Sequence, residues 1–329
     1  MINILVLVED EKAPSCRFRW RQFIEPLAAE GLVLEIREIP RQTALRKRLF
    51  RDGEDFAGVI LHRKLLRRGD FRRLRRFARR LIYDFDDAVM FRDSNASRLL
   101  SRARRIRFQR VVSGADLVIA GNEYLQQQAS PEAGRTELIP TVVDIGTFPH
   151  RPTPGEGKVI GWMGTASNFV YLSLICNPLK TLLQDRPDIV FRVVADRLPE
   201  LAGIPLDYRQ WSGKQETAEL AGFSVGIMPL FDDPWTRGKC AFKLLQYGAA
   251  FVPAVSSPVG ANLSVIREGE TGYFARSEGE WRRRLEELLD SPGKREEMGR
   301  SARRLVETKY SLGFAVPRLA QIIRRVVKE

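Results

Sequence analysis

The 329-residue chain alternates short apolar segments with helical ones along its whole length. In the first half the apolar segments are INILVLVE, LVLEIREI, AGVILH, RLIYDFDD and ADLVIAG. Between the first two, the apolar residues Trp20, Phe23, Ile24 and Leu27 recur at helical spacing. Such alternation is typical of a parallel sheet covered by helices on both faces. We therefore expect an α/β protein.

A segment dense in proline and glycine, residues 147–157, interrupts this pattern and predicts a linker. The pattern restarts at KVIGWMG and continues through IVFRVVAD, FSVGIMPL and FVPAVSS, and Ser277 with Glu280 forms a capping-box pattern before a further helix. We expect two Rossmann-like, doubly wound parallel-sheet domains, 1–150 and 151–312, that face a cleft at the carboxyl ends of both sheets. The remaining residues, 313–329, are expected to form a helix that packs back toward the N-terminal domain.

Several classes of protein and site are not expected. No apolar run approaches the length of a membrane span, and the N-terminus has no pattern of a signal peptide. The cysteines Cys16, Cys176 and Cys240 never form a CxxC pair, which argues against disulfides and structural zinc. The two histidines, His62 and His150, lie in different contexts, so no metal site is expected, and His62 is interpreted as structural. A cytoplasmic location fits best.

Positive charge is concentrated in the first half. Between Arg41 and Arg110 there are 22 basic residues against eight acidic ones, an excess greater than the +13 of the whole chain. Much of it lies in FRRLRRFARRL, a basic amphipathic helix by its spacing. The basic face is either only solvated or binds anionic lipid headgroups, where each Lys or Arg contributes about 1 kcal/mol. No recognition motif supports nucleic acid as a partner.

A phosphate-binding helix start is the clearest chemical signal. In WTRGKCAFKLLQ, Gly238 precedes a predicted helix whose first two turns carry Lys239 and Lys243, four residues apart and so on one face. Lysines near a helix N-terminus oppose its dipole, and the free N–H groups there also favour an anion. A diphosphate would satisfy both, although both lysines could simply face water. The sequence GWMG after a strand is a weaker phosphate-loop signal.

Several segments together resemble the retaining, family-4 type of GT-B glycosyltransferases, also called glycosyl transferases group 1. The segment FKLLQYGAAFVPAVSSPVGANLSVIREGETGYFA (242–275) is similar to the family's donor-binding stretch. In the N-terminal half, PSCRFRWRQFIEPLAAEG, LIYDFDDAVMFRD and ADLVIAGNEYL resemble a bacterial subgroup. The resemblance implies transfer of a sugar from a nucleotide-diphosphate donor to an acceptor hydroxyl, with retention and without a metal or other cofactor.

The resemblance also implies roles for particular residues. The implied donor-binding residues are Gly164, Thr165, Lys239, Lys243, Gln246, Ser257, Val259 and Gly260. Lys239 and Lys243 would neutralise the departing diphosphate, and Gln246 would bind the ribose. Arg17 and Arg19 would hold the donor's phosphate or an anionic acceptor.

The chain departs from the family pattern at several positions. Gly238 and Gln246 stand where the family often has two glutamates. Asp86, followed by Asp87, stands where a histidine commonly lies near the sugar, so these carboxylates are candidate catalytic residues; alternatively DFDDA is a strand-end turn that Asp87 caps. Phe251 stands where the helix usually ends in glycine, so a left-handed cap there would cost ~1 kcal/mol unless the turn is built differently.

The expected function is a hexosyltransferase-like glycosyltransferase of cell-surface polysaccharide or glycolipid synthesis. Its partners would be a nucleotide sugar, an acceptor glycan or lipid-linked sugar, and an anionic inner-membrane surface reached through the basic first domain. Two alternatives stay open. A nucleotide-sugar epimerase would share the two-domain architecture, and a non-catalytic nucleotide-binding relative would explain the missing glutamates.

Overall fold

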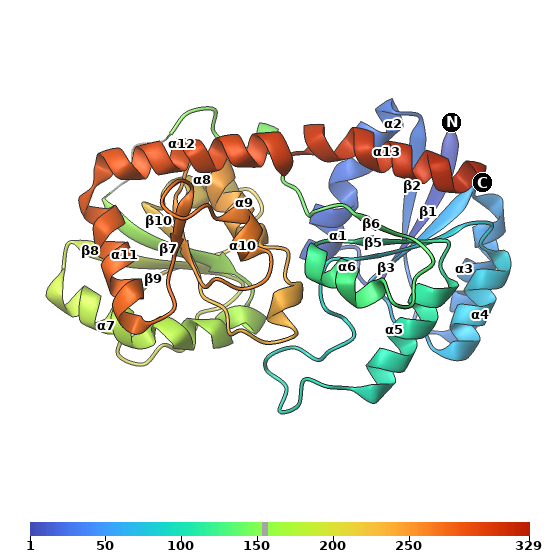
Figure 1. Ribbon diagram of the computed structural model, residues 1–329, viewed down its shortest axis with the longest axis horizontal. Helices are drawn as coiled ribbons and strands as arrows, with labels where there is room; N and C mark the ends of the chain where they lie inside the picture. The colour runs from blue at the N-terminus through green and yellow to red at the C-terminus, as the bar shows by residue number, and fades with distance from the viewer. Residues whose placement is uncertain (153–156) are drawn as a thin grey trace. The chain divides into compact units, whose positions relative to one another are not determined.

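The chain forms two compact units, each built on one six-stranded parallel sheet (Figure 1). The computed structural model describes residues 1–152 and 157–329, so residues 153–156 of the expected linker lie outside the described part. Unit 1 comprises Met1–Val142, Arg237–Cys240 and Leu312–Glu329, and unit 2 comprises Val143–Thr236 and Ala241–Ser311. The prediction of two Rossmann-like α/β domains is confirmed.

The sheet of unit 1 has the strand order β2-β1-β3-β4-β5-β6. Its strands are β1 (Ile2–Val8), β2 (Leu32–Glu38), β3 (Gly58–His62), β4 (Leu81–Phe85), β5 (Leu117–Ala120) and β6 (Thr136–Leu138). Its α-helices are α1 (Pro14–Arg19), α2 (Ile24–Ala29), α3 (Thr43–Arg51), α4 (Arg68–Phe77), α5 (Arg102–Gly114), α6 (Glu123–Ala129) and α13 (Leu312–Lys328). Helices α2 and α13 lie on one side of the sheet, and α3, α4 and α5 lie on the other (Figure 1).

The central strands of unit 1 are apolar because both of their faces are covered. Residues Ile4 to Val8 of β1 and all of β3 and β4 are buried. Helix α13 buries Leu319, Ile323 and Val326 in the same core as Ile4 and Ile60, so the last helix of the chain completes the core of the first unit.

The sheet of unit 2 has the strand order β12-β11-β10-β7-β8-β9. Its strands are β7 (Lys158–Gly164), β8 (Ile189–Ala195), β9 (Asp207–Gln210), β10 (Val225–Met228), β11 (Ala254–Ser256) and β12 (Gly272–Phe274). Its α-helices are α7 (Cys176–Asp185), α8 (Glu216–Ala221), α9 (Phe242–Ala249), α10 (Asn262–Val265), α11 (Glu278–Asp290) and α12 (Pro292–Lys309). Short 3₁₀ segments occur at Arg21–Phe23, Asp52–Asp55, Ile145–Thr147, Ala166–Ile175 and Thr236–Gly238.

The predicted cap of helix α11 is present. The Ser277 side chain accepts a hydrogen bond from the Glu280 backbone N–H, and the Glu280 carboxylate accepts one from the Arg276 backbone N–H at 2.6 Å. The bond from the Arg276 N–H lowers the pKa of Glu280, because it stabilises the ionised carboxylate.

Helix α9 ends in a left-handed turn at Phe251, whose φ is +62°. The Phe251 N–H donates to the Gly248 carbonyl at 3.0 Å, and the Val252 N–H donates to the Tyr247 carbonyl at 2.9 Å. This is the hydrogen-bond pattern of a Schellman motif, which normally has glycine at the left-handed position. Of the two alternatives left open by the sequence, the structure has the left-handed cap.

Helices α9 and α12 approach each other closely at two glycines. A Cβ on Gly299 would lie 2.0 Å from the Phe251 carbonyl oxygen, and a Cβ on Gly248 would lie 2.9 Å from a methyl carbon of Val306. The first of these neighbours is backbone and cannot move aside as a flexible side chain could. The left-handed turn at Phe251 therefore fits only against a residue without a side chain.

We predict that Gly299→Ala destabilises the protein by more than 1 kcal/mol, although alanine is normally favoured over glycine inside a helix by up to about 1 kcal/mol. The matched control is Gly293→Ala near the start of the same helix, where a Cβ would meet nothing within 4 Å. Urea denaturation of both variants measures the difference. Equal stability of the two variants would contradict the close packing described here.

No helix among the described residues is long and apolar enough to cross a membrane.

Candidate active-site residues of the two units

A buried carboxylate, Asp84, lies at the centre of the polar network in unit 1. It is the fourth residue of β4 and has no exposed surface. The Arg19 Nη2 donates to its Oδ1 at 2.7 Å, the Trp20 Nε1 donates to its Oδ2 at 3.0 Å, and His62 Nδ1 lies 2.8 Å from Oδ2. Burial disfavours the charge of Asp84, but Arg19 and His62 outweigh it and hold the pKa of Asp84 at about 2. The group is therefore ionised.

The Arg19 side chain forms hydrogen bonds within unit 1. Its side chain is 3% exposed, and its Nη1 donates to the Ile139 carbonyl at 2.7 Å, in addition to the bonds with Asp84. These contacts join α1, β4 and the segment after β6. Because the guanidinium is already paired, we do not retain Arg19 among the residues that bind a phosphate. Arg17 is half-buried, and its guanidinium lies 4.5 Å from the centre of the Phe18 ring.

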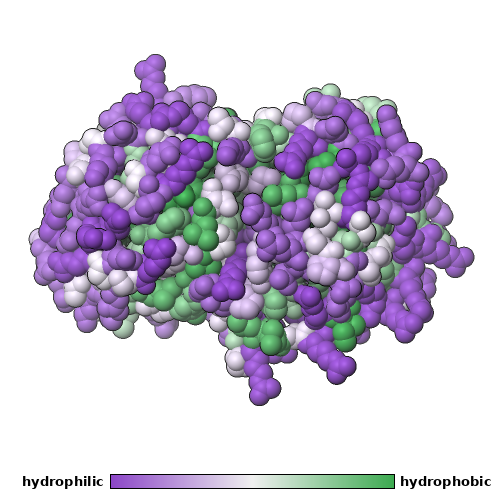
Figure 2. Space-filling view, in the orientation of Figure 1, coloured by the Kyte–Doolittle hydropathy of each residue, from purple (hydrophilic) through white to green (hydrophobic). Residues whose placement is uncertain are grey.

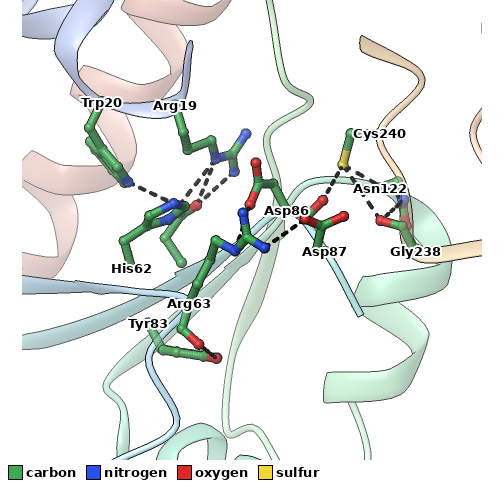
Figure 3. Close-up of polar contacts among 11 residues, drawn as sticks. Arg19, Trp20, His62, Arg63, Tyr83, Asp86, Asp87, Asn122, Gly238 and Cys240 are labelled. Atoms are coloured by element: carbon green, nitrogen blue, oxygen red, sulfur yellow. Dashed lines mark hydrogen bonds and ion pairs between the residues drawn. The ribbon is translucent and has the colours of Figure 1, made fainter. Parts of the chain in front are cut away.

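The two candidate catalytic carboxylates, Asp86 and Asp87, follow β4 directly and face Arg63 (Figure 3). The Arg63 Nη2 lies 2.7 Å from Asp87 Oδ2, and its Nε lies 3.6 Å from Asp86 Oδ1. Arg63 has a φ of +59°, and its carbonyl accepts a hydrogen bond from the Tyr83 hydroxyl at 3.2 Å. A left-handed arginine beside two carboxylates is the kind of strained residue that concentrates at functional sites.

Asp87 has an unusual electrostatic environment. Burial raises its pKa above the ordinary value, against the lowering effect of the positive charges of Arg63 and Lys239. Sequence analysis did not single out Arg63, because a basic residue after a strand is no signal among so many other arginines. The left-handed backbone that aims it at the aspartates is visible only in the structure.

Residues Arg237–Cys240 belong to unit 1, and Asn122 holds them there. The Asn122 Nδ2 donates to the Gly238 carbonyl at 3.0 Å and to the Lys239 carbonyl at 3.2 Å (Figure 3). The Cys240 thiol donates to the Asp86 carbonyl at 3.1 Å. A Cβ on Gly238 would lie 2.5 Å from the Cβ of Ala88, so glycine is required for this approach. Burial raises the pKa of the Cys240 thiol, which makes it a poor nucleophile.

The prediction that Lys239 and Lys243 lie on one helix is wrong, because Lys239 lies outside the helix. Helix α9 begins at Phe242, after Ala241 in a left-handed conformation with a φ of +54°. The left-handed residue breaks the helical spacing, so Lys239 lies in unit 1 while Lys243 lies in the first turn of α9 in unit 2. The two lysines therefore do not share a helix face.

In unit 2, Gly164 and Lys243 are brought together at the carboxyl end of β7. A Cβ on Gly164 would lie 2.9 Å from Lys243 Cε, and the Lys243 ammonium lies 5.3 Å from the centre of the Trp162 ring. Glycine at 164 thus leaves the space that the lysine stem occupies. The next residue, Thr165, accepts a hydrogen bond from Asn168 Nδ2 at 2.9 Å.

The Ser257–Gly260 turn follows β11 at the same edge of the sheet. Because β7, β10 and β11 are parallel neighbours, their carboxyl ends lie side by side. The Ser257 hydroxyl accepts from the Leu230 N–H at 3.0 Å, the Val259 N–H donates to the Ser257 carbonyl at 2.9 Å, and Gly260 has a φ of +54°. The turn is therefore rigidly held by its own backbone and by the end of β10.

Gln246 is buried on the inner side of α9, and its Nε2 donates to Glu216 Oε1 at 2.7 Å. Both side chains are nearly inaccessible to water. Its amide nitrogen is engaged within unit 2, so we do not retain Gln246 as a ribose ligand. Within the described residues no group of three or more His, Cys, Asp or Glu side chains is arranged to hold a metal ion.

No protein-family model matches the chain, and a comparison with curated proteins finds no match. Solved structures do match over the whole length. Sucrose-phosphate synthase from Thermosynechococcus elongatus aligns with a TM-score of 0.80 at 14% identity and 100% coverage of both chains. HepE from Anabaena in complex with UDP and glucose aligns with a TM-score of 0.70 at 13% identity, covering 99% of this chain and 100% of that one.

A glycosyltransferase from Rickettsia africae ESF-5 aligns with a TM-score of 0.69 at 10% identity, covering 100% of this chain and 99% of that one. HepE has also been solved with UDP-glucose. At these identities the likeness establishes a fold, and that fold is the pair of Rossmann-like domains of GT-B glycosyltransferases.

We predict that Asp84→Asn lowers the free energy of unfolding by about 3–5 kcal/mol, because it leaves the buried Arg19 charge without its counter-ion. The control is Glu35→Gln, which removes an exposed ion pair with Arg37 and should cost less than about 1 kcal/mol. Urea denaturation at neutral pH measures both. A loss for Asp84→Asn no greater than that of the control would show that the network does not stabilise unit 1.

Proposed function

We propose that the protein is a glycosyltransferase that moves a sugar, with retention at the anomeric carbon, from a nucleoside-diphosphate donor to an acceptor hydroxyl. The observation that carries the proposal is the placement of Lys243 against Gly164 at the carboxyl edge of the unit 2 sheet. In a doubly wound fold this edge is where nucleotides bind. The ability of HepE, a protein of similar fold, to bind UDP-glucose supports the same ligand class.

Within unit 2, we assign the diphosphate to Lys243, the first turn of α9 and the turn at Ser257, Val259 and Gly260. Lys243 supplies a positive charge where negative charge develops on the departing nucleotide, which lowers the barrier to cleavage of the sugar–phosphate bond. Gly164 and Thr165 line the same edge, where Gly164 leaves the space that the Lys243 stem occupies.

Within unit 1, we assign the acceptor side of the reaction to Asp86 and Asp87. Their carboxylates are hydrogen-bond acceptors for sugar hydroxyls, and Arg63 and Lys239 balance their charge. Arg17, on α1 of the same unit, remains a candidate for an anionic group of the donor or acceptor. No metal or cofactor is assigned a role in this scheme.

We predict that Lys243→Ala weakens binding of UDP or GDP by about 10- to 100-fold, the usual loss for a hydrogen bond to a charged group. Isothermal titration measures it. Lys309→Ala, which removes an exposed lysine at the end of α12, is the control and should leave the affinity unchanged. Absence of binding of either nucleotide to the unmodified protein at millimolar concentration would contradict the proposed function. Unchanged affinity in Lys243→Ala would remove only this lysine from the site.

We also propose that unit 1 binds an anionic membrane surface, as an enzyme of glycolipid or surface-polysaccharide synthesis would need. Arg72, Arg76 and Arg79 on and after α4 are exposed, and Leu100, just before α5, is 74% exposed. Figure 2 shows hydrophobic residues beside hydrophilic ones along the lower edge of the molecule, where Figure 1 places the segment before α5. Exposed arginines and an exposed leucine on the same unit suit a lipid headgroup layer, which accepts both positive charge and aliphatic side chains.

We predict that changing Arg72, Arg76 and Arg79 together to Gln reduces binding to phosphatidylglycerol-containing vesicles roughly 100-fold, at about 1 kcal/mol for each arginine. The control changes three exposed arginines of unit 2, Arg197, Arg276 and Arg304, and so removes the same net charge. Vesicle co-sedimentation measures binding. Equal losses in the two triple variants would show that the attraction is nonspecific and would contradict a membrane-binding face on α4.

A further inference from the structure

Trp162 and Met163 are neighbours on β7, and their side chains lie on opposite faces of the unit 2 sheet. Side chains alternate between the two faces along a strand, and these two residues accordingly belong to different apolar clusters. Met163 packs in the cluster that contains Leu244 and Leu245 of α9. Trp162 is 1% exposed and packs in the cluster that contains the leucines of α7. Helix α9 therefore covers the face of the sheet that is turned away from Trp162.

The Lys243 side chain nevertheless reaches from α9 to the Trp162 ring. Its ammonium lies over the ring, 5.3 Å from the centre. Because β7 is an inner strand between β10 and β8, a side chain can pass from one face to the other only beyond the strand end, and β7 ends at Gly164. A Cβ on Gly164 would lie 2.9 Å from Lys243 Cε and 2.8 Å from Trp162 Cη2. The side chain that glycine lacks is thus the gap through which the lysine stem passes.

The contact between the ammonium and the ring is attractive. The face of an aromatic ring carries negative charge, and tryptophan binds a cation more strongly than tyrosine or phenylalanine does. The Trp162 ring is itself packed against the Phe169 ring, with 5.6 Å between the two centres. A lysine side chain has several rotatable bonds, and fixing them when a ligand binds weakens the affinity. A lysine already held over a buried ring has lost this freedom on folding.

We propose that Trp162 is a positioning residue, which holds the Lys243 ammonium at the carboxyl end of β7 before any ligand binds. That this ammonium then meets a diphosphate rests on the function proposed above, but its placement by Trp162 does not. In the segment GWMG, both the tryptophan and the last glycine serve to place the lysine.

The placement can be measured without a nucleotide. In protein labelled with ¹³C at the lysine Cε, the Lys243 ε-protons should resonate upfield of those of other lysines, because the ring current of Trp162 shields them. The signal is assigned by its absence from Lys243→Arg. Trp162→Leu should return it to the ordinary range, and so should Gly164→Ala, which fills the gap and leaves the ring in place. The control is Trp281→Leu, which removes a buried tryptophan from the same apolar cluster and should leave the Lys243 signal unchanged.

Nucleotide affinity gives a second readout. Trp162→Leu should weaken binding of UDP or GDP about 3- to 10-fold, and Trp162→Phe, which keeps an aromatic face, should lose less. When Lys243 is already alanine, Trp162→Leu should cause no further loss, because the ring then has no ammonium to hold. Isothermal titration of the single and double variants measures both effects.

Three results would overturn the proposal: an unshifted Lys243 signal in the unmodified protein, an equal loss of nucleotide affinity in Trp281→Leu, or additive losses in the double variant. If the unmodified protein binds neither UDP nor GDP, the function proposed above fails, and the ¹³C signal alone then decides the role of Trp162.

Discussion

The buried ion pair between Asp84 and Arg19 is the interaction on which the arrangement of unit 1 depends. A carboxylate without exposed surface is tolerated only because Arg19, Trp20 and His62 satisfy it from two different elements. Since Asp84 lies near the end of β4, the same contacts fix the position of the next residues along the chain. The backbone that carries the charged residues Arg63, Asp86 and Asp87 is therefore held in a fixed position, as the backbone of a binding or catalytic group must be.

The diphosphate site proposed for unit 2 lies at the carboxyl edge of its sheet. Two glycines shape this edge: Gly164 leaves room for the Lys243 stem, and Gly260 adopts a left-handed turn after β11. A lysine in the first turn of a helix opposes the helix dipole and gains most from an anionic ligand. The carboxylates of unit 1 are hydrogen-bond acceptors, and Lys243 gives the edge of the unit 2 sheet a positive charge. These are the chemistries that the proposed acceptor hydroxyl and diphosphate need.

The fold could be predicted from the sequence because strands that are buried on both faces consist of continuous apolar residues. The cap at Ser277 could also be predicted, because its hydrogen bonds join residues that are close in the sequence. Prediction from the sequence failed where the deciding contact is distant along the chain. Asp84 and Arg19 are 65 residues apart, and Asn122 reaches a carbonyl 116 residues away. The helix expected to carry Lys239 fails because a left-handed Ala241 interrupts it, and no periodicity reveals a backbone torsion. The pairing of Gln246 with Glu216, 30 residues apart, was hidden for the same reason.

Sugar transfer by this protein is tested by following the anomeric proton of UDP-glucose and GDP-mannose by NMR in the presence of the protein and a mixture of sugar and polyol acceptors. A retaining glycosyltransferase should consume one donor, release free nucleoside diphosphate and produce a new anomeric signal with the donor's configuration. Interconversion of the sugar with the nucleotide still attached would identify an epimerase. Donor binding without any consumption would identify a non-catalytic relative, and either result would contradict the proposed transfer.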